Sequence, residues 1–126
     1  MEKFEREWSE TGGRRYLYVR PRTAINNDDW MAFMEAELDG FSDGVFRILV
    51  DVVGVEEDIG IDGFSRVSEF LKALGVHRAR FAVLPADQFY SILATLFDRV
   101  AESKGLELEV ELFHQRSAAE AWLGEQ

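Results

Sequence analysis

Apolar and polar positions alternate with a period of two at the start of the chain, a pattern typical of a half-buried β-strand. Phe4, Arg6 and Trp8 alternate there with glutamates. Residues 15–20 (RYLYVR) form a second segment rich in strand-favouring residues. The Thr-Gly-Gly sequence at 11–13 lies between the two segments and is a turn signal. The pattern therefore predicts an antiparallel hairpin.

Two almost continuous apolar runs follow, and such runs indicate strands that are buried on both faces. They cover residues 45–53 and 80–84. A third run, 106–112, alternates leucine or valine with glutamate, so it predicts a strand with one apolar and one solvated face. Since this row carries like charges, it also discourages pairing with another sheet edge.

Apolar positions three and four residues apart predict four helices between and after these strands. The first is capped by Asn26 or Asn27 and ends near Gly40. The second carries apolar positions at 67, 70, 71 and 74. We expect Ser65 to cap its N-terminus, with Asp62 as the alternative cap.

The third helix has the clearest apolar stripe, between residues 89 and 100. The fourth begins at Ser117, which forms an S-x-x-E capping box with Glu120. Its predicted packing face consists of Ala118, Ala121 and Trp122.

Strands that alternate with helices predict an α/β fold: a mixed, mostly parallel sheet entered through an antiparallel hairpin, with about four helices. The length of 126 residues suits one domain over residues 1–126. The hydrophobic fraction of 47% excludes a disordered chain.

Charge and cysteine content narrow the functional classes. Fourteen Lys and Arg against 24 Asp and Glu give a net charge of −10, which argues against a nucleic-acid partner. The sequence has no cysteine, so disulfides and thiolate chemistry are excluded. His77 and His114 are far apart and lack metal-ligand spacing, and no phosphate-binding glycine motif appears. We predict no cofactor and no metal.

No run approaches 18 apolar residues, so we predict no transmembrane segment. The N-terminus lacks the apolar core of a signal peptide, and we expect a cytoplasmic protein. Glu56, Glu57 and Asp58 follow a buried strand and could supply an acid or base, but a charged loop is usually solvated. No serine lies in a G-x-S-x-G elbow, and we predict no enzymatic activity.

The segments ILVDVVGV (48–55), RFAVLP (80–85) and FHQRSAAEAWL (113–123), in this order, resemble the SpoIIAA-like proteins. These are relatives of the STAS domains, found in sulfate transporters and anti-sigma-factor antagonists. The resemblance covers roughly residues 15–123. It implies a single STAS-like domain that regulates a process by binding a protein and has no enzymatic activity.

In anti-sigma-factor antagonists, an Asp-Ser-Ser-Gly turn at a helix start holds a serine that a partner kinase phosphorylates. The matching turn here resembles Asp62-Gly63-Phe64-Ser65, with Gly63 and Phe64 in place of the two serines. Ser65 is therefore a displaced candidate for phosphorylation. A phosphate at a helix N-terminus is favoured by free amides, whereas the acidic neighbours oppose it.

Sites in parallel sheets tend to lie outside the carboxyl ends of the strands. We therefore predict that an unknown protein partner docks on the loop and helix start at 54–68 together with residues 85–88. An exposed apolar patch near Ile59 or Phe64 would support this reading. The predicted partner-binding residues are Ile59, Asp62, Gly63, Phe64, Ser65, Pro85 and Asp87.

The alternative is a carrier of a small apolar ligand or lipid, because similar folds are compared with Sec14-type domains. A carrier needs a cavity of several hundred cubic ångströms, whereas a binding module needs a filled core. An enzyme, the third reading, needs a recessed carboxylate with a raised pKa. The aromatic residues that could line a carrier cavity are Trp30, Phe33, Phe64, Phe89 and Phe97.

Overall fold

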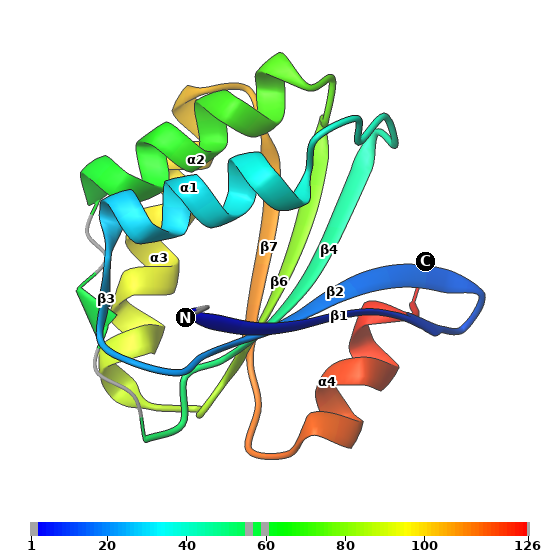
Figure 1. Ribbon diagram of the computed structural model, residues 1–126, viewed down its shortest axis with the longest axis vertical. Helices are drawn as coiled ribbons and strands as arrows, with labels where there is room; N and C mark the ends of the chain where they lie inside the picture. The colour runs from blue at the N-terminus through cyan, green and yellow to red at the C-terminus, as the bar shows by residue number, and fades with distance from the viewer. Residues whose placement is uncertain (1–2, 55–56, 59–60, 126) are drawn as a thin grey trace.

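The computed structural model describes residues 3–54, 57–58 and 61–125. In this part of the chain five strands form one sheet, in the order β1-β2-β4-β6-β7 (Figure 1). The first two strands form the predicted antiparallel hairpin, and the remaining neighbours pair in parallel. The strands are β1 Phe4–Thr11, β2 Arg14–Pro21, β4 Val45–Asp51, β6 Arg78–Leu84 and β7 Glu107–Leu112.

The two apolar runs lie side by side at the centre of the sheet, as predicted. Val45 is opposite Arg78 at one end of the pair, and Asp51 is opposite Leu84 at the other. The strand β4 ends at Asp51, two residues before the predicted end. The carboxyl ends of β4 and β6 therefore meet at one edge of the sheet.

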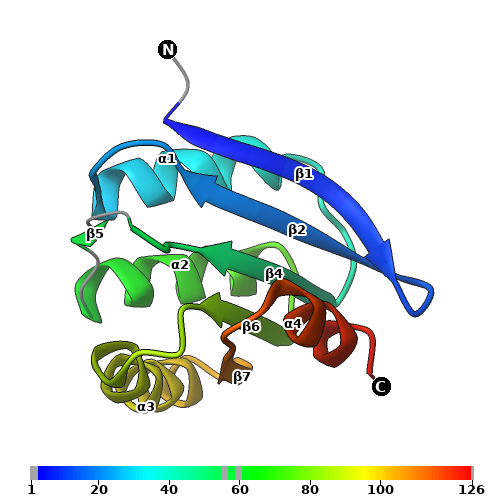
Figure 2. The same ribbon diagram turned by 90° about the horizontal axis from the view of Figure 1, so that it is seen from below.

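The helices cover both faces of the sheet. In Figure 2, α4 lies in front of β4 and β6, whereas α1 and α2 lie behind the sheet. A large apolar cluster, which includes Phe46 and Leu71, fills the side of α1, α2 and α3. A smaller cluster, which includes Leu49 and Leu123, lies under α4. The helices are α1 Asn27–Glu37, α2 Ile61–Ala73, α3 Gln88–Ser103 and α4 Arg116–Leu123.

The start of α1 confirms one of the two predicted caps. The Asn26 side chain accepts a hydrogen bond from the Asp29 amide at 2.9 Å, and the Asp29 carboxylate accepts one from the Asn26 amide at 3.1 Å. This reciprocal capping box satisfies two amides that the helix leaves unpaired. Asn26, rather than Asn27, is therefore the cap.

The sequence pattern did not predict a second, two-stranded parallel sheet formed by β3 (Ile25–Asn26) and β5 (Glu57–Asp58). Strands of two residues are too short to show a period. The pairing joins the segment before α1 to the segment that precedes α2.

The predicted cap of α2 is wrong. The helix begins at Ile61, so Ser65 is its fifth residue and lies inside it. The helical spacing of Val67 and Leu71 extends back through Phe64, which is buried with them. Glycine often indicates a turn, so Gly63 suggested that the helix begins after it. In the structure Gly63 lies inside the helix.

The predicted capping box of α4 is also wrong. The helix begins at Arg116, and its cap residue Gln115 makes no side-chain capping bond. Glu120 instead accepts a hydrogen bond from the Tyr16 hydroxyl at 2.8 Å and pairs with Arg116 at 3.3 Å. Because a buried tyrosine hydroxyl needs a partner, this long-range bond takes the place of the local one.

The packing face of α4 differs from the predicted one as well. Ala119 and Leu123 are fully buried, four residues apart, whereas Ala118 and Ala121 are exposed. Trp122 packs partly against the smaller cluster, as predicted. Alanines occupy both sides of this short helix, so their positions alone did not identify the buried side.

Candidate functional site

The segments that leave the carboxyl ends of the parallel strands lie together at the bottom of Figure 1. The amide of Val52, just after β4, donates to the Leu84 carbonyl at 2.9 Å. The amide of Phe113, just after β7, donates to the Val83 carbonyl at 2.9 Å. These backbone bonds fix the exits of three strands relative to one another.

Two large hydrophobic side chains are exposed in the described part of the chain, and both belong to this edge. Val53 follows β4 and is 46% exposed, and Ile92, in the second turn of α3, is 58% exposed. Pro85 and Asp87 connect β6 to α3, with Pro85 half-buried and Asp87 exposed. We call the surface formed by Val53, Pro85, Asp87 and Ile92 the carboxyl rim.

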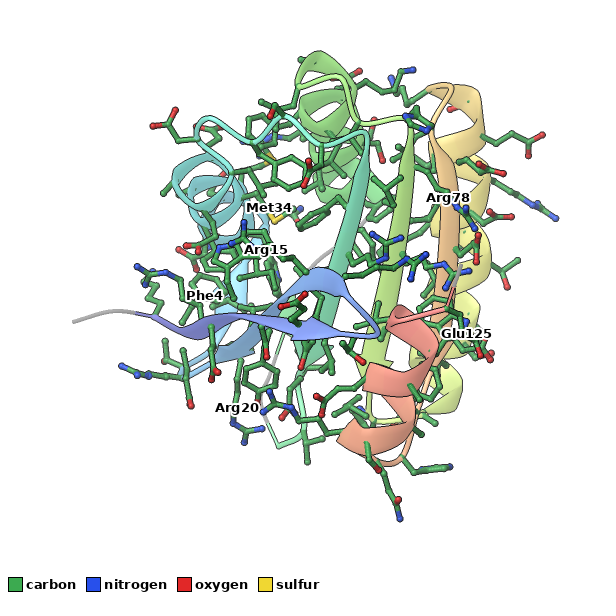
Figure 3. The ribbon with its side chains drawn as sticks, turned by 90° about the vertical axis from the view of Figure 1, so that its right-hand side faces the viewer. Phe4, Arg15, Arg20, Met34, Arg78 and Glu125 are labelled. Carbon is green, nitrogen blue, oxygen red and sulfur yellow. The ribbon has the colours of Figure 1, made fainter. Side chains whose placement is uncertain are left out.

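Asp51, the last residue of β4, fixes the backbone at the rim. Its carboxylate accepts hydrogen bonds from the Tyr18 hydroxyl at 2.9 Å and from the Val53 amide at 3.2 Å. It also pairs with the Arg20 guanidinium at 2.9 Å, and Arg20 donates to the Val53 carbonyl at 3.1 Å. Figure 3 shows Arg20 at this lower edge of the molecule. The backbone of Val53 is therefore held in place by hydrogen bonds to Asp51 and Arg20.

Tyr18 is held in its neutral form. Burial, the hydrogen bond to Asp51 and the charge of Asp51 raise the pKa of Tyr18 to about 12. The Arg116 guanidinium lies over the ring at 3.9 Å from its centroid. Since the hydroxyl stays protonated, Tyr18 serves as a permanent donor to Asp51 and braces the rim.

The predicted apolar patch at Phe64 is wrong. Phe64 is only 2% exposed, and its ring stacks on Phe97 at 4.1 Å between centroids. Gly63 is also buried, and a side chain added there would collide with Asn27 in α1. Both residues thus hold helices together.

The remaining predicted residues are distributed unevenly. Ile59 and the side chain of Asp62 lie outside the described part of the structure. Ser65 is half-buried inside α2. Pro85 and Asp87 lie at the rim, where the Asp87 carbonyl accepts the Ser91 amide at 3.0 Å and so begins α3. Pro85 and Asp87, like Val53 and Ile92, follow the carboxyl ends of β4 and β6, and the sequence pattern did not single out Val53 or Ile92.

Some aromatic residues were candidates for the lining of a carrier cavity. Those whose side chains are described contact neighbouring rings instead. Trp30 and Phe33 both pack on Phe4, at centroid distances of 5.1 Å and 4.5 Å. Phe64 and Phe97 stack on each other, and the side chain of Phe89 is not described. These are contact distances for aromatic pairs, so they favour a filled core over a carrier cavity.

Among the described carboxylates, Asp29 has a shifted pKa, and the shift is opposite to the one that a general acid needs. Hydrogen bonds from Lys3 and from the Asn26 backbone lower the pKa of Asp29, whereas a general acid needs a raised pKa. Glu56 and the side chains of Glu57 and Asp58 are not described. Within the described residues, no three His, Cys, Asp or Glu side chains are grouped closely enough to hold a metal ion.

The sequence analysis did not identify a row of arginines near the amino ends of the parallel strands, opposite to the carboxyl rim. Arg78, labelled in Figure 3, belongs to this row. Arg14, Arg47, Arg78 and Arg80 come from three adjacent strands, β2, β4 and β6. Glu109 pairs with Arg78 at 2.5 Å and with Arg80 at 3.3 Å. The signal was present in the sequence, because a charge in the middle of an apolar strand such as VFRILVD requires an explanation.

Comparison with known proteins defines the class of fold. No protein-family model and no curated protein matches the chain. The sheet order, the N-terminal hairpin and the four helices are those of a SpoIIAA-like α/β fold.

A similar solved structure is that of an uncharacterized protein of the DUF3478 family from Shewanella loihica PV-4, described as having a SpoIIAA-like fold. The alignment covers 98% of this chain and 95% of that protein, with a TM-score of 0.59 and 11% identity. The resemblance inferred from the sequence is thus confirmed for the fold. None of the helices in the described ranges has the length and apolar character that a membrane crossing needs.

Proposed function

We propose that this protein is a non-enzymatic binding module that docks a partner protein on the carboxyl rim. The observation that carries the proposal is the exposure of Val53 and Ile92 on segments that leave two adjacent strands. Because contiguous exposed apolar patches mark interaction sites, we infer that the two side chains belong to one patch on the rim. The hydrogen bonds of Asp51 hold the Val53 turn in place, so little ordering is needed on binding.

The charge of the chain indicates what the partner carries. Residues 51–62 contain five Asp and Glu and no Lys or Arg, and the whole chain has a net charge of −10. Asp87 adds an exposed carboxylate at the rim itself. We therefore infer a partner surface that offers apolar side chains surrounded by lysine or arginine. The contacts between the described aromatic rings favour the docking function over the carrier alternative.

Substitutions at the rim test this proposal. Proteins from an extract of the source cells are captured on the wild-type chain, and each candidate is purified and titrated. We expect Ile92→Glu and Val53→Glu to weaken binding at least tenfold, because they place a charge in the apolar contact. Ala121→Glu, on the exposed side of α4, is the matched control and should bind like the wild type.

Affinity should also fall as salt is added, because the attraction between acidic and basic surfaces is screened. A partner that binds Ile92→Glu and Ala121→Glu equally well would contradict docking at the rim. Lipid that co-purifies with the wild-type chain, in place of a saturable protein partner, would favour the carrier alternative.

We also propose that phosphorylation of Ser65 regulates the binding of the partner protein. A phosphate adds about −1.5 to −2 charges, and on a half-buried residue inside α2 it would disturb the packing of that helix. We expect Ser65→Glu to weaken partner binding and Ser65→Ala to preserve it. Intact-mass measurement of the protein from its own cells shows whether the modification occurs, and an unmodified Ser65 under all conditions would exclude it.

A further inference from the structure

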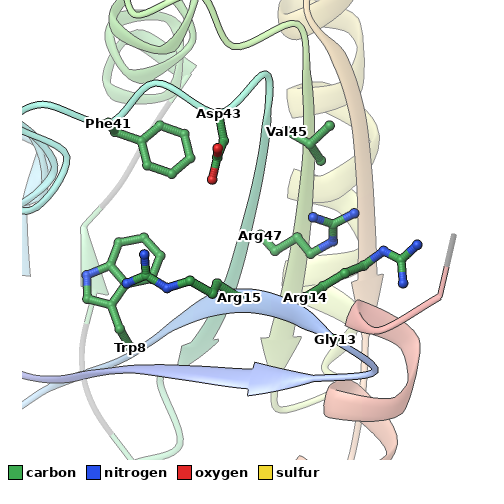
Figure 4. A pocket seen from close by; sticks show the side chains of 8 residues that line it. All are labelled: Trp8, Gly13, Arg14, Arg15, Phe41, Asp43, Val45 and Arg47. Atoms are coloured by element: carbon green, nitrogen blue, oxygen red, sulfur yellow. The ribbon is translucent and has the colours of Figure 1, made fainter.

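A pocket opens between the start of β2 and the start of β4, far from the carboxyl rim (Figure 4). It has a volume of about 270 Å³. The two strands pair only from Leu17 and Ile48 onwards, so their first residues diverge and leave room between them. We call it the arginine pocket, and its principal lining residues are Trp8, Arg14, Arg15, Phe41, Asp43 and Arg47.

The pocket is positively charged in a protein of net charge −10. Three arginines and one aspartate line it, which is a formal charge of +2. Two of the arginines have partners: Arg14 donates to the Gly124 carbonyl at 3.2 Å, and Arg15 lies over the Trp8 ring at 4.9 Å from its centroid. In Figure 4, Arg15 reaches toward Trp8.

Arg78 pairs with Glu109 although its own Nε is buried and unpaired, whereas Arg47 has no ion-pair partner in the described part of the chain. The Nε of Arg47 is buried and unpaired, although the residue lies in the middle of a central strand. A buried polar group without a partner costs free energy. In Figure 4, Arg47 and Arg14 extend side by side along the pocket.

The surroundings of Arg47 repel its charge. Burial lowers the pKa of Arg47, and so do the charges of Arg14, Arg80 and Arg78, while Asp43 opposes the shift. Glu109 is already occupied by Arg78 and Arg80. An anion placed beside Arg47 would supply both the missing acceptor and the missing negative charge.

We propose that the arginine pocket binds the carboxylate or phosphate group of a small aromatic molecule, with Arg47 as the principal ligand and Arg14 beside it. The planar guanidinium recognises both kinds of oxyanion by the same paired hydrogen bonds. The rings of Trp8 and Phe41, nearly parallel and 6.3 Å apart, form an aromatic wall on one side of the pocket. The volume of the pocket restricts the ligand to a small molecule, since pockets for drug-sized ligands measure roughly 300–1,000 Å³.

This site is independent of the proposed docking function. The arginine pocket lies at the amino ends of the parallel strands, and the carboxyl rim lies at the opposite ends. Substitutions in one need not alter the other, so each proposal can fail separately.

The test is a titration of the full chain with benzoate, phenyl phosphate and inorganic phosphate at constant ionic strength, by calorimetry. We expect saturable binding at one site by at least one aromatic probe. Arg47→Met, which keeps an unbranched apolar stem but removes the guanidinium and its charge, should weaken binding at least tenfold. Arg99→Met, an exposed position on α3, is the control and should bind like the wild type.

Asp43→Asn should strengthen binding about threefold or more, because it removes the one negative charge in the pocket. Thermal unfolding checks that the Arg47→Met variant is folded. The probe should raise the melting temperature of the wild type and leave that of the Arg47→Met variant unchanged. Tighter binding of benzoate favours a carboxylate as the natural group, and tighter binding of phenyl phosphate favours a phosphate. Absence of saturable binding by every probe, or equal binding by Arg47→Met and wild type, would overturn the proposal.

Discussion

Phe64 lies where α2, α3 and β6 meet, so loss of its buried ring should lower the free energy of unfolding. Its ring stacks on Phe97 of α3 and meets Phe81 of β6 edge-on at 5.9 Å. Each contact joins α2 to another part of the core. A residue proposed for partner binding from its position in a turn is thus a structural anchor.

Phe64→Ala should lower the free energy of unfolding by about 3–5 kcal/mol, because it removes a buried ring and leaves a cavity. Ile92→Ala, on the exposed rim, should change it by no more than about 0.5 kcal/mol. Urea unfolding of the two variants measures both values. Equal effects would contradict the burial of one side chain and the exposure of the other.

Tyr18 makes stability depend on pH in the alkaline range. Its pKa is about 12 in the folded protein and about 10 in an unfolded chain. The stabilisation from the neutral phenol is therefore complete below pH 10 and is lost as the pH rises from 10 to 12. The difference in unfolding free energy between wild type and Tyr18→Phe should fall over this interval. A constant difference, measured by urea unfolding at several pH values, would contradict the raised pKa.

At the residue scale, the sequence predicted features that depend on near neighbours. The sequence limited the cap of α1 to Asn26 or Asn27, and Asn26 is the cap. Its partner in the capping box, Asp29, is only three residues away. The partners of Phe64 and Glu120 come from residues 33 and 104 positions away, so no local pattern could identify them.

Among the elements, α1 and α2 approach closely at Gly63. A Cβ atom at this position would overlap the side chain of Asn27. The helix thus accepts a glycine in its first turn, although glycine lowers helix propensity, because a larger residue would push α1 away.

Gly63→Ala should therefore destabilise the protein, since the overpacking cost of about 1–3 kcal/mol exceeds the gain in helix propensity of about 1 kcal/mol. In an Asn27→Ala background the same substitution should cost less, because the overlapping amide group is gone. A double-mutant cycle by urea unfolding measures this coupling. Strict additivity of the two substitutions would show that the helices do not meet at these residues.

The order of the elements could be predicted because each strand and helix has its own hydrophobic period. The starts of α2 and α4 could not, because they depend on tertiary contacts. Glycine at 63 looks like a turn until the neighbouring helix is known, and the Ser117–Glu120 motif looks like a cap until Tyr16 is seen to use Glu120. The arginine pocket likewise depends on three strands, although Arg47 within an apolar run was a visible signal.

At the scale of the whole molecule, α4 ties the hairpin to the centre of the sheet. Thr11 donates to the Glu120 carbonyl at 3.0 Å, and Arg80 donates to the Trp122 carbonyl at 2.9 Å. The turn of the hairpin fits against the end of the helix so closely that a Cβ at Gly12 would lie 2.9 Å from the Gly124 carbonyl oxygen. The contacts of Thr11 and Gly12 with α4 join residues more than a hundred positions apart.

Leu123→Ala should lower the free energy of unfolding by about 2–5 kcal/mol, because Leu123 is fully buried between α4 and the sheet. It should also loosen the hairpin turn, whose partners are on α4. Hydrogen exchange should therefore speed up at the amides of residues 11–14 more than at those of β4. Uniform acceleration along the chain would show that the hairpin does not depend on α4.

The position of α4 has a consequence for biosynthesis. The ribosome makes all five strands of the main sheet before it reaches residues 116–123, so one side of this nascent sheet, including Leu49 and Ala82, has no helix to cover it until then. During this interval the growing polypeptide exposes an apolar surface, which is the kind of surface that chaperones recognise. Synonymous codons that slow translation just before residue 116 should therefore prolong the period in which the newborn chain can aggregate.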